Sequence, residues 1–291
     1  MCTFDTKKIF FFRIKKLFAL YFIIMNSNKI LSDFESGISK FISGQSVDCV
    51  IIGYENEELR VLLLKWKHAE IWGLPGGFIN MDEDMDKAAE RVLKERTGLE
   101  FPFLSQFYTF GDCQRRNMDH TRELLKLMGM KSQSLNQWFS QRFITTGYLA
   151  PVNIRECGKP EPDNLSSRCE WVPAKKIPEL AFDHKQIIGK ALEHLRIRIN
   201  YLPLGRTLLP ETFTMKELQK LYEAVLGRQL DRGNFQRKIL KLDMLVRLNK
   251  KPDAGAHKAP YLYRFDPVKY TDRSHRGIGF NLMDINGKKK A

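Results

Sequence analysis

The sequence predicts an α+β protein of two domains, an N-terminal α/β/α sandwich followed by a smaller C-terminal winged helix-turn-helix domain. Three observations support this prediction. Strand-like segments and amphipathic helices are mixed over residues 46–200. Two helices with clear capping signals follow, and the second is basic and precedes two short strand-like segments. The length of 291 residues suits two domains, and a linker at 201–210 is indicated by its content of Pro and Gly.

Positive charge is concentrated in the last third of the chain. The formal net charge is +14, and residues 201–291 contribute 19 Lys and Arg against 9 Asp and Glu, or +10. This skew indicates an acidic partner such as nucleic acid. The five cysteines form no CxxC pair and have no metal-ligand spacing, which is typical of free thiols in a reducing compartment. We expect a cytoplasmic protein that holds no metal and needs no cofactor.

Residues 1–45 are interpreted as an N-terminal extension that includes a short amphipathic helix from Ile30 to Ile42. The apolar start is broken by basic residues, and its longest charge-free run, Leu17 to Asn28, is too short to span a bilayer. No small-residue cleavage site follows it. We favour translation from Met25 over an interfacial membrane anchor, and expect no membrane partner.

The first domain, 46–200, is predicted from runs of apolar residues. Its expected strands are Val47–Gly53, its hairpin partner Leu59–Trp66, Phe103–Phe110, Phe143–Ala150 and a strand at Glu170–Val172, and its closing helix is Lys185–Ile199. Residues 112–141 contain one helix-like run, Thr121–Met128, and are either a lid or dimer contact or a solvated loop.

The stretch from Trp72 to Glu100 reads as strand, glycine-rich turn and helix. Apolar residues recur at three- and four-residue steps after Asp82, and Gly98 is the expected helix stop. This stretch resembles the Nudix box, in which glycine, glutamate, arginine and aliphatic positions have fixed spacing. Seven residues fall on that pattern, namely Gly77, Glu83, Arg91, Leu93, Glu95, Gly98 and Leu99.

Two positions of the box depart from the pattern. Val92 and Arg96 stand where the resemblance implies glutamates that, with Glu95, hold divalent metals on one helix face. The formal charge of that face changes from about −3 to about 0, and an arginine beside a lone carboxylate opposes cation binding. The resemblance therefore implies a Nudix scaffold with no catalytic residues and no metal, which favours a ligand sensor over a hydrolase.

The closing segment Leu180–His184 also resembles Nudix domains, in the branch that includes ADP-ribose hydrolases and Nudix-derived regulators. His184 is either a catalytic base or, as we favour, a residue that orients a loop. We expect the effector to bind between the box helix, the Gly73–Phe78 turn and the 112–141 insertion. The residues assigned to this effector pocket are Trp72, Phe78, Glu95 and His184.

The second domain, 211–275, begins with a capping box formed by Thr214 and Glu217, with Gly227 at the helix end. Asp231 is the expected N-cap of a second helix that runs to about Met244, with inward-facing apolar positions at Phe235, Ile239 and Leu242 and a further candidate at Leu240. Strand-like segments Leu245–Leu248 and Tyr261–Phe265 flank a basic loop, which is typical of a wing. A basic tail follows at 276–291.

The basic second helix and the wing are predicted to bind DNA. Arginine can pair with guanine and asparagine with adenine, whereas lysine holds phosphates. The candidate DNA-binding residues are Arg232, Asn234, Arg237, Lys238, Lys241, Arg247, Lys250, Lys251 and Lys258. The alternative is a solvated basic face, or a partner that is RNA or protein.

Over residues 46–267 the chain resembles the Nudix-related transcriptional regulators of bacteria. That resemblance implies a homodimer that binds a palindromic operator in double-stranded DNA and whose Nudix domain senses a small-molecule effector. Some members sense ADP-ribose, and the arabinose-regulator branch, which this chain resembles most, senses a sugar such as L-arabinose. The alternative is an active Nudix hydrolase of ADP-ribose or a related nucleoside diphosphate.

Overall fold

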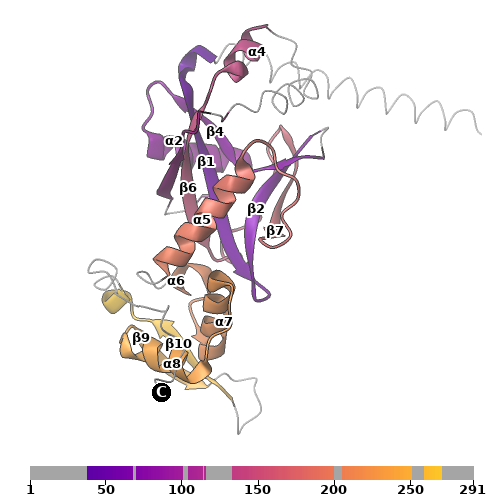
Figure 1. The fold of residues 1–291 in the computed structure, drawn as a ribbon. Coiled ribbons are helices and arrows are strands. Elements are labelled where there is room, and N and C mark those ends of the chain that lie inside the picture. The colour runs from indigo at the N-terminus through magenta and orange to yellow at the C-terminus, as the bar shows by residue number, and fades with distance from the viewer. Residues whose placement is uncertain are drawn as a thin grey trace, which may run out of the picture.

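The structure is a computed structural model in which two β-sheets organise the chain (Figure 1). It describes residues 38–67, 70–100, 104–113, 115, 133–199, 205–250 and 259–270. The segment 1–24, the run Thr121–Met128 and the basic tail, for which the sequence made predictions, lie outside these residues. Within the described ranges, no helix has both the length and the apolar character needed to cross a membrane.

The larger sheet forms the body of the first domain. Its main path has the strand order β3-β2-β1-β6-β5, with β4 paired to β1 and β7 paired to β2. Strand β1 runs antiparallel to β2 and β4 and parallel to β6. The strands are β1 (Phe41–Glu55), β2 (Glu58–Trp66), β3 (Trp72–Gly73), β4 (Gly76–Asn80), β5 (Ser105–Phe110), β6 (Ile144–Val152) and β7 (Ser166–Pro173).

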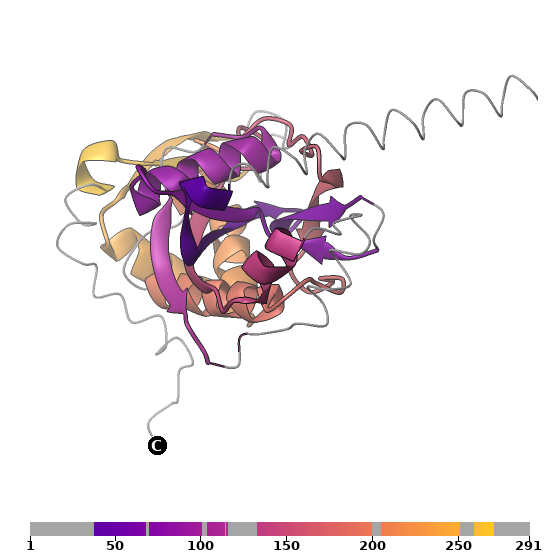
Figure 2. The same cartoon turned by 90° about the horizontal axis from the view of Figure 1, so that it is seen from above.

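Alternation along β1 places apolar side chains on both faces of the sheet, because successive residues of a strand point to opposite sides. Cys49 and Ile51 belong to the core beneath α2 (Met85–Thr97). Val50 and Ile52 belong to the core beneath α5 (His184–Arg198). The two helices lie on opposite faces of the sheet (Figure 2), and the predicted α/β/α sandwich is therefore confirmed.

The second domain is a winged helix, as predicted. Its helices are α6 (Gly205–Leu208), α7 (Met215–Leu226) and α8 (Arg232–Lys241), and its strands are β8 (Phe213–Thr214), β9 (Leu245–Lys250) and β10 (Tyr261–Phe265). The three strands form a sheet of order β8-β10-β9. The β9–β10 pair leads into and out of the predicted wing, whose residues 251–258 are outside the described ranges.

The two domains share one hydrophobic core. Leu195 and Ile199, at the end of α5, belong to the same buried cluster as Leu208 of α6 and Leu218 of α7. The Arg196 Nε–H also donates to the carbonyl of Val225, at 3.1 Å. The end of α5 is therefore packed against the winged helix, as Figure 1 shows.

Several predicted element boundaries are wrong. The predicted helix Ile30–Ile42 is replaced, where it is described, by a 3₁₀ turn at Ile38–Lys40 and by β1 from Phe41, which pairs with Asn80 of β4. Helix α6 (Gly205–Leu208) occupies part of the predicted linker 201–210. A helix that was not predicted, α4 (Gln133–Ser140), ends the insertion.

The predicted second helix of the winged domain also ends earlier than expected. It ends at Lys241, since Asp243 adopts a left-handed conformation with φ 52° and turns the chain before Met244. Because of this turn Met244 is buried outside the helix. Phe235 and Ile239 face inward as predicted, but Leu240 is 42% exposed and does not.

Replacing Thr214 by alanine is expected to lower the free energy of unfolding by about 1 kcal/mol. The Thr214 hydroxyl accepts from the Glu217 amide at 3.2 Å, and the Glu217 carboxylate accepts from the Thr214 amide at 2.7 Å, so that the capping box is complete. Urea denaturation measures the loss. Thr214→Ser keeps the hydroxyl and should retain the wild-type free energy of unfolding. If both variants lost the same free energy, the loss would be due to the threonine methyl group and not to the capping hydroxyl.

Candidate functional site

The glycine-rich turn packs directly against the box helix. A Cβ atom at Gly77 would lie 2.8 Å from Val92 Cγ2, and one at Gly76 would lie 2.2 Å from Asp48 Oδ1. Val92 is only 2% exposed. The glycines are therefore required by close approach, and Val92 contributes to the core.

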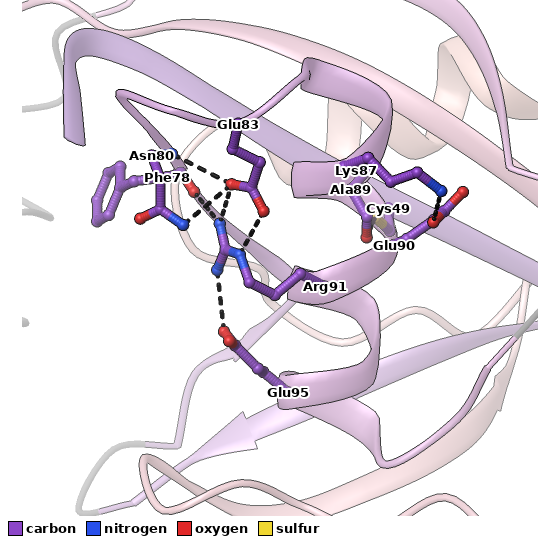
Figure 3. A network of polar contacts seen from close by, with 9 residues as sticks. All are labelled: Cys49, Phe78, Asn80, Glu83, Lys87, Ala89, Glu90, Arg91 and Glu95. Atoms are coloured by element: carbon purple, nitrogen blue, oxygen red, sulfur yellow. Dashed lines mark hydrogen bonds and ion pairs between the residues drawn. The ribbon is translucent and has the colours of Figure 1, made fainter. Parts of the chain in front are cut away.

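The three charged residues that match the box pattern, Glu83, Arg91 and Glu95, are paired with one another (Figure 3). The Arg91 guanidinium donates to both oxygens of Glu83 at 2.7 Å, to the carbonyl of Phe78 at 2.9 Å and to Glu95 at 3.1 Å. The hydrogen bond from Arg91 lowers the pKa of Glu83 below its ordinary value. Glu83, Arg91 and Glu95 thus form one network that joins the turn to the helix.

Arg96 is directed away from this network. Its guanidinium forms an ion pair with Asp163, and both side chains are 12% exposed. It also lies 5.8 Å from the centroid of the Trp66 ring. The Arg96 Nε–H has no hydrogen-bond partner among the described residues. From the sequence we expected Arg96 to be the cation that acts on Glu95. The cation that Glu95 contacts is Arg91.

The box residues do not fit a divalent metal. Val92 is apolar and buried, Arg96 is a cation, and the carboxylates of Glu83 and Glu95 are already bound to Arg91. Hard cations such as magnesium require several oxygen ligands. Across the part of the chain that the structure describes, no group of three or more His, Cys, Asp or Glu could hold a metal ion.

Acid is expected to destabilise the protein partly through Glu83. Since its folded pKa is depressed from 4.5, its contribution is present above that value and is lost as the pH falls through the lower, folded pKa. Glu83→Gln should therefore lower stability at pH 7 by about 1.5–3 kcal/mol and flatten the decline below pH 4.5. Urea denaturation at several pH values measures both.

Glu90 supplies the matched control for that experiment. It pairs with Lys87 on the same helix, but the two side chains are 51% and 67% exposed, and exposed pairs contribute little. Glu90→Gln should change neither the stability at pH 7 nor its decline in acid. If Glu83→Gln behaved as Glu90→Gln does, the network would have no role in stability.

A second polar cluster lies under the turn, around His184. The Leu74 amide donates to His184 Nδ1 at 3.0 Å, and His184 Nε2 lies 3.5 Å from Asp48 Oδ1. The Thr145 hydroxyl donates to Asp48 Oδ2 at 2.8 Å. Burial raises the pKa of Asp48, but the interactions with His184, Arg115 and Thr145 together outweigh it, so that the net direction is down. His184 therefore holds the turn, which is the orienting role that the sequence favoured.

Arg115 ties the insertion to this cluster. It donates to both carboxylate oxygens of Asp183, at 2.5 and 2.9 Å, and to the carbonyl of Phe143 at 2.8 Å. It also lies 3.8 Å from Asp48 Oδ2. The sequence singled out neither Arg115 nor Asp48, since no local pattern marks side chains whose partners are distant along the chain.

The four residues assigned to the effector pocket do not form one contact set, although Glu95 and the Phe78 carbonyl both accept from Arg91. Glu95 pairs with Arg91, and His184 contacts Leu74 and Asp48. The Trp72 carbonyl accepts from the amide of Ala181, close to His184 in sequence. Phe78 instead belongs to a group of aromatic rings that includes Trp138 of α4.

The described DNA-binding candidates lie on α8 and β9. Arg232, Arg237 and Lys241 are exposed, whereas Asn234 and Lys238 are partly covered. The Asp231 carboxylate caps α8 by accepting from the Asn234 amide. On β9, Arg247 and Lys250 are exposed and lie 3.4 and 5.7 Å from the centroid of the Tyr261 ring. Lys251 and Lys258 are outside the described ranges.

Two family models match the chain. The NUDIX domain matches residues 43–195, and the NrtR DNA-binding winged helix domain matches residues 205–265. A protein of Acinetobacter baylyi, the ADPR responsive transcriptional repressor NtrR, is 28% identical over 227 residues, which are 76% of this chain and 81% of that protein.

Solved structures agree with these matches. The crystal structure of Shewanella oneidensis NrtR is 27% identical, with a TM-score of 0.59, over 79% of this chain and 97% of that one. Its complex with a 27mer DNA is 28% identical, with a TM-score of 0.58, over 78% and 95% of the two chains.

Proposed function

The chain belongs to the NUDIX domain family and ends in an NrtR-type winged helix, and from this premise we propose that it is a DNA-binding transcriptional repressor that responds to ADP-ribose or a related nucleotide. The observation that carries the proposal is that a capped, basic α8 follows a NUDIX domain whose box residues do not fit a divalent metal. Three exposed cations, Arg232, Arg237 and Lys241, lie on this helix.

ADP-ribose is preferred over a free sugar as the effector. The similar Acinetobacter baylyi protein is described as ADPR responsive, and none of the relatives given above supports the sugar-responsive branch that the sequence resembled. Because Val92 and Arg96 replace the expected glutamates, the proposed role is to bind this nucleotide without magnesium and without hydrolysing it.

The proposed DNA complex contains two copies of the chain. One α8 can contact the bases of one half-site, and a homodimer would place two such helices in successive major grooves of a palindrome, about 34 Å apart. The crystallised complex of the Shewanella oneidensis protein with DNA supports DNA as the partner, in preference to RNA or protein.

Helix α5 supplies a route from effector to DNA. It begins at His184, in the polar cluster beneath the turn, and ends against α7, where Arg196 donates to Val225. An effector that binds more tightly when α5 is in one of two positions would shift the population toward that position. Because α5 packs against α7, the shift would also favour one placement of the winged helix.

Fluorescence anisotropy of the full chain on DNA from its own promoter region tests the proposal. We expect a salt-sensitive preference over a scrambled duplex of equal length, weakened by ADP-ribose without magnesium and unchanged by L-arabinose. No preference would refute the DNA-binding function. Magnesium-dependent release of AMP from ADP-ribose would instead identify a hydrolase.

A further inference from the structure

Five aromatic rings gather where the insertion meets the box. We call them the aromatic cluster, and they are Phe41, Phe78, Trp138, Phe139 and Phe143. Each ring lies within 5.4–6.5 Å, centroid to centroid, of at least one other. Trp138 is 9% exposed, and the four phenylalanines are only partly buried.

The aromatic cluster adjoins the remnant box directly. Phe78 lies on β4, and its carbonyl accepts from Arg91 at 2.9 Å. Trp138 and Phe139 come from α4, which ends the insertion. The aromatic cluster therefore connects the glycine-rich turn, where the effector was expected to bind, with α4 of the 112–141 insertion.

Two hydrogen-bond donors of this region have no partner in the part of the chain that the structure describes. The Trp138 Nε1–H and the Gln141 Nε2 amide are both buried and unbonded among the described residues. The Gln141 Oε1 accepts from the Ser43 hydroxyl at 2.7 Å, and its Nε2 lies on the other side of the amide. Such a donor costs about 1–3 kcal/mol if it is left unsatisfied, and buried polar groups are rarely left so.

The chemistry of these groups favours a flat ring that carries acceptors. Aromatic side chains stack on the face of any nucleic-acid base, worth about 1–3 kcal/mol per base. Both unpartnered groups donate, and the ring nitrogens of a purine accept. Neither donor is charged, whereas phosphate is bound best by cations, and a free sugar offers no aromatic face.

We propose that α4 and the aromatic cluster recognise the base of a nucleotide effector, with Trp138 Nε1 and Gln141 Nε2 donating to acceptors on a purine ring. This inference rests on the proposed function for the nature of the effector. It assigns α4 a specificity role, because a nucleotide would be distinguished from a phosphorylated sugar by contacts that only its base can make.

Calorimetric titration of the full chain with ADP-ribose, and separately with ribose 5-phosphate, tests the site. Trp138→Phe keeps an aromatic ring and removes the donor, and Gln141→Glu replaces a donor by an acceptor while the bond to Ser43 can remain. We expect each variant to bind ADP-ribose about tenfold more weakly, as the loss of one hydrogen bond implies. Any affinity for ribose 5-phosphate should not change.

Trp171→Phe, a substitution of the same kind on β7, is the control and should bind ADP-ribose as the wild type does. The midpoint of thermal unfolding must stay equal across the variants, and if Trp138→Phe fails this test, Gln141→Glu decides the outcome. Wild-type affinity for ADP-ribose in the variant that folds would overturn the base-binding site and leave the proposed function intact. No binding by the wild-type protein would refute ADP-ribose as effector and the site together.

Discussion

Replacing Asp163 by alanine is expected to lower the free energy of unfolding by about 3–5 kcal/mol, which is the range for removing one partner of a buried ion pair. Removal of the Asp163 carboxylate leaves the Arg96 side chain, which is 12% exposed, without its counter-ion. The cost arises because a buried charge cannot recover its hydration, and burial already lowers the pKa of Arg96. Urea denaturation of the full chain measures the change.

The control is Glu193→Ala, which breaks an exposed pair with Lys190 whose side chains are 44% and 55% exposed. It should change stability by less than about 0.5 kcal/mol. The double variant Arg96→Met, Asp163→Leu removes both charges and should recover much of the loss, since apolar replacement of a buried pair is often neutral. If Asp163→Ala cost no more than the control, Arg96 would be hydrated in solution.

Arg237→Ala is expected to weaken binding to the operator by about 1–3 kcal/mol and to relax preference at one base pair. Its guanidinium is exposed on α8 and donates to Asn234 Oδ1 at 2.8 Å, so that the two side chains are held together. This fixed geometry lowers the entropy lost on contacting a base. Anisotropy on the operator and on single-base variants measures both effects.

Lys87→Ala removes the same charge from an exposed residue of α2 and should leave DNA binding unchanged. Lys258, which the sequence predicts to contact phosphate, should behave differently again: Lys258→Ala should weaken binding to every sequence and reduce the salt dependence by about one ion. If Arg237→Ala and Lys258→Ala weakened every nucleic acid equally, DNA sequence readout by α8 would be excluded.

Local sequence patterns predicted most of the fold, because helix caps and helix ends are determined by residues close together in the sequence. Gly98 and Gly227 end helices in the left-handed conformation that glycine allows, and Thr214 and Asp231 cap the next helices as their spacing indicated. The exceptions have tertiary causes. Phe41 joins a strand because Asn80 offers it a partner, and Leu240 is exposed because α8 packs through Phe235 and Ile239.

Only part of the candidate site could be predicted from the sequence, because local patterns do not report contacts between distant residues. The box spacing identified Glu83, Arg91 and Glu95, which lie within two turns of one helix or just before it. The partner of Arg96 is 67 residues away, and Thr145 and Asp48 are 97 residues apart. Only the folded chain brings such residues together, and the aromatic cluster formed by Phe78 and α4 was missed for this reason.

The parallel pairing of β1 with β6 has a consequence for the order in which the chain folds. Strands β1 and β2 meet through a turn at Asn56 and Glu57, both with positive φ, and such hairpins form early. Strand β6 can join only after the whole insertion has been synthesised. Loop-closure entropy grows only with the logarithm of length, so the insertion costs little equilibrium stability. It does prolong the time during which a central apolar strand has an open edge, which is when aggregation competes with folding.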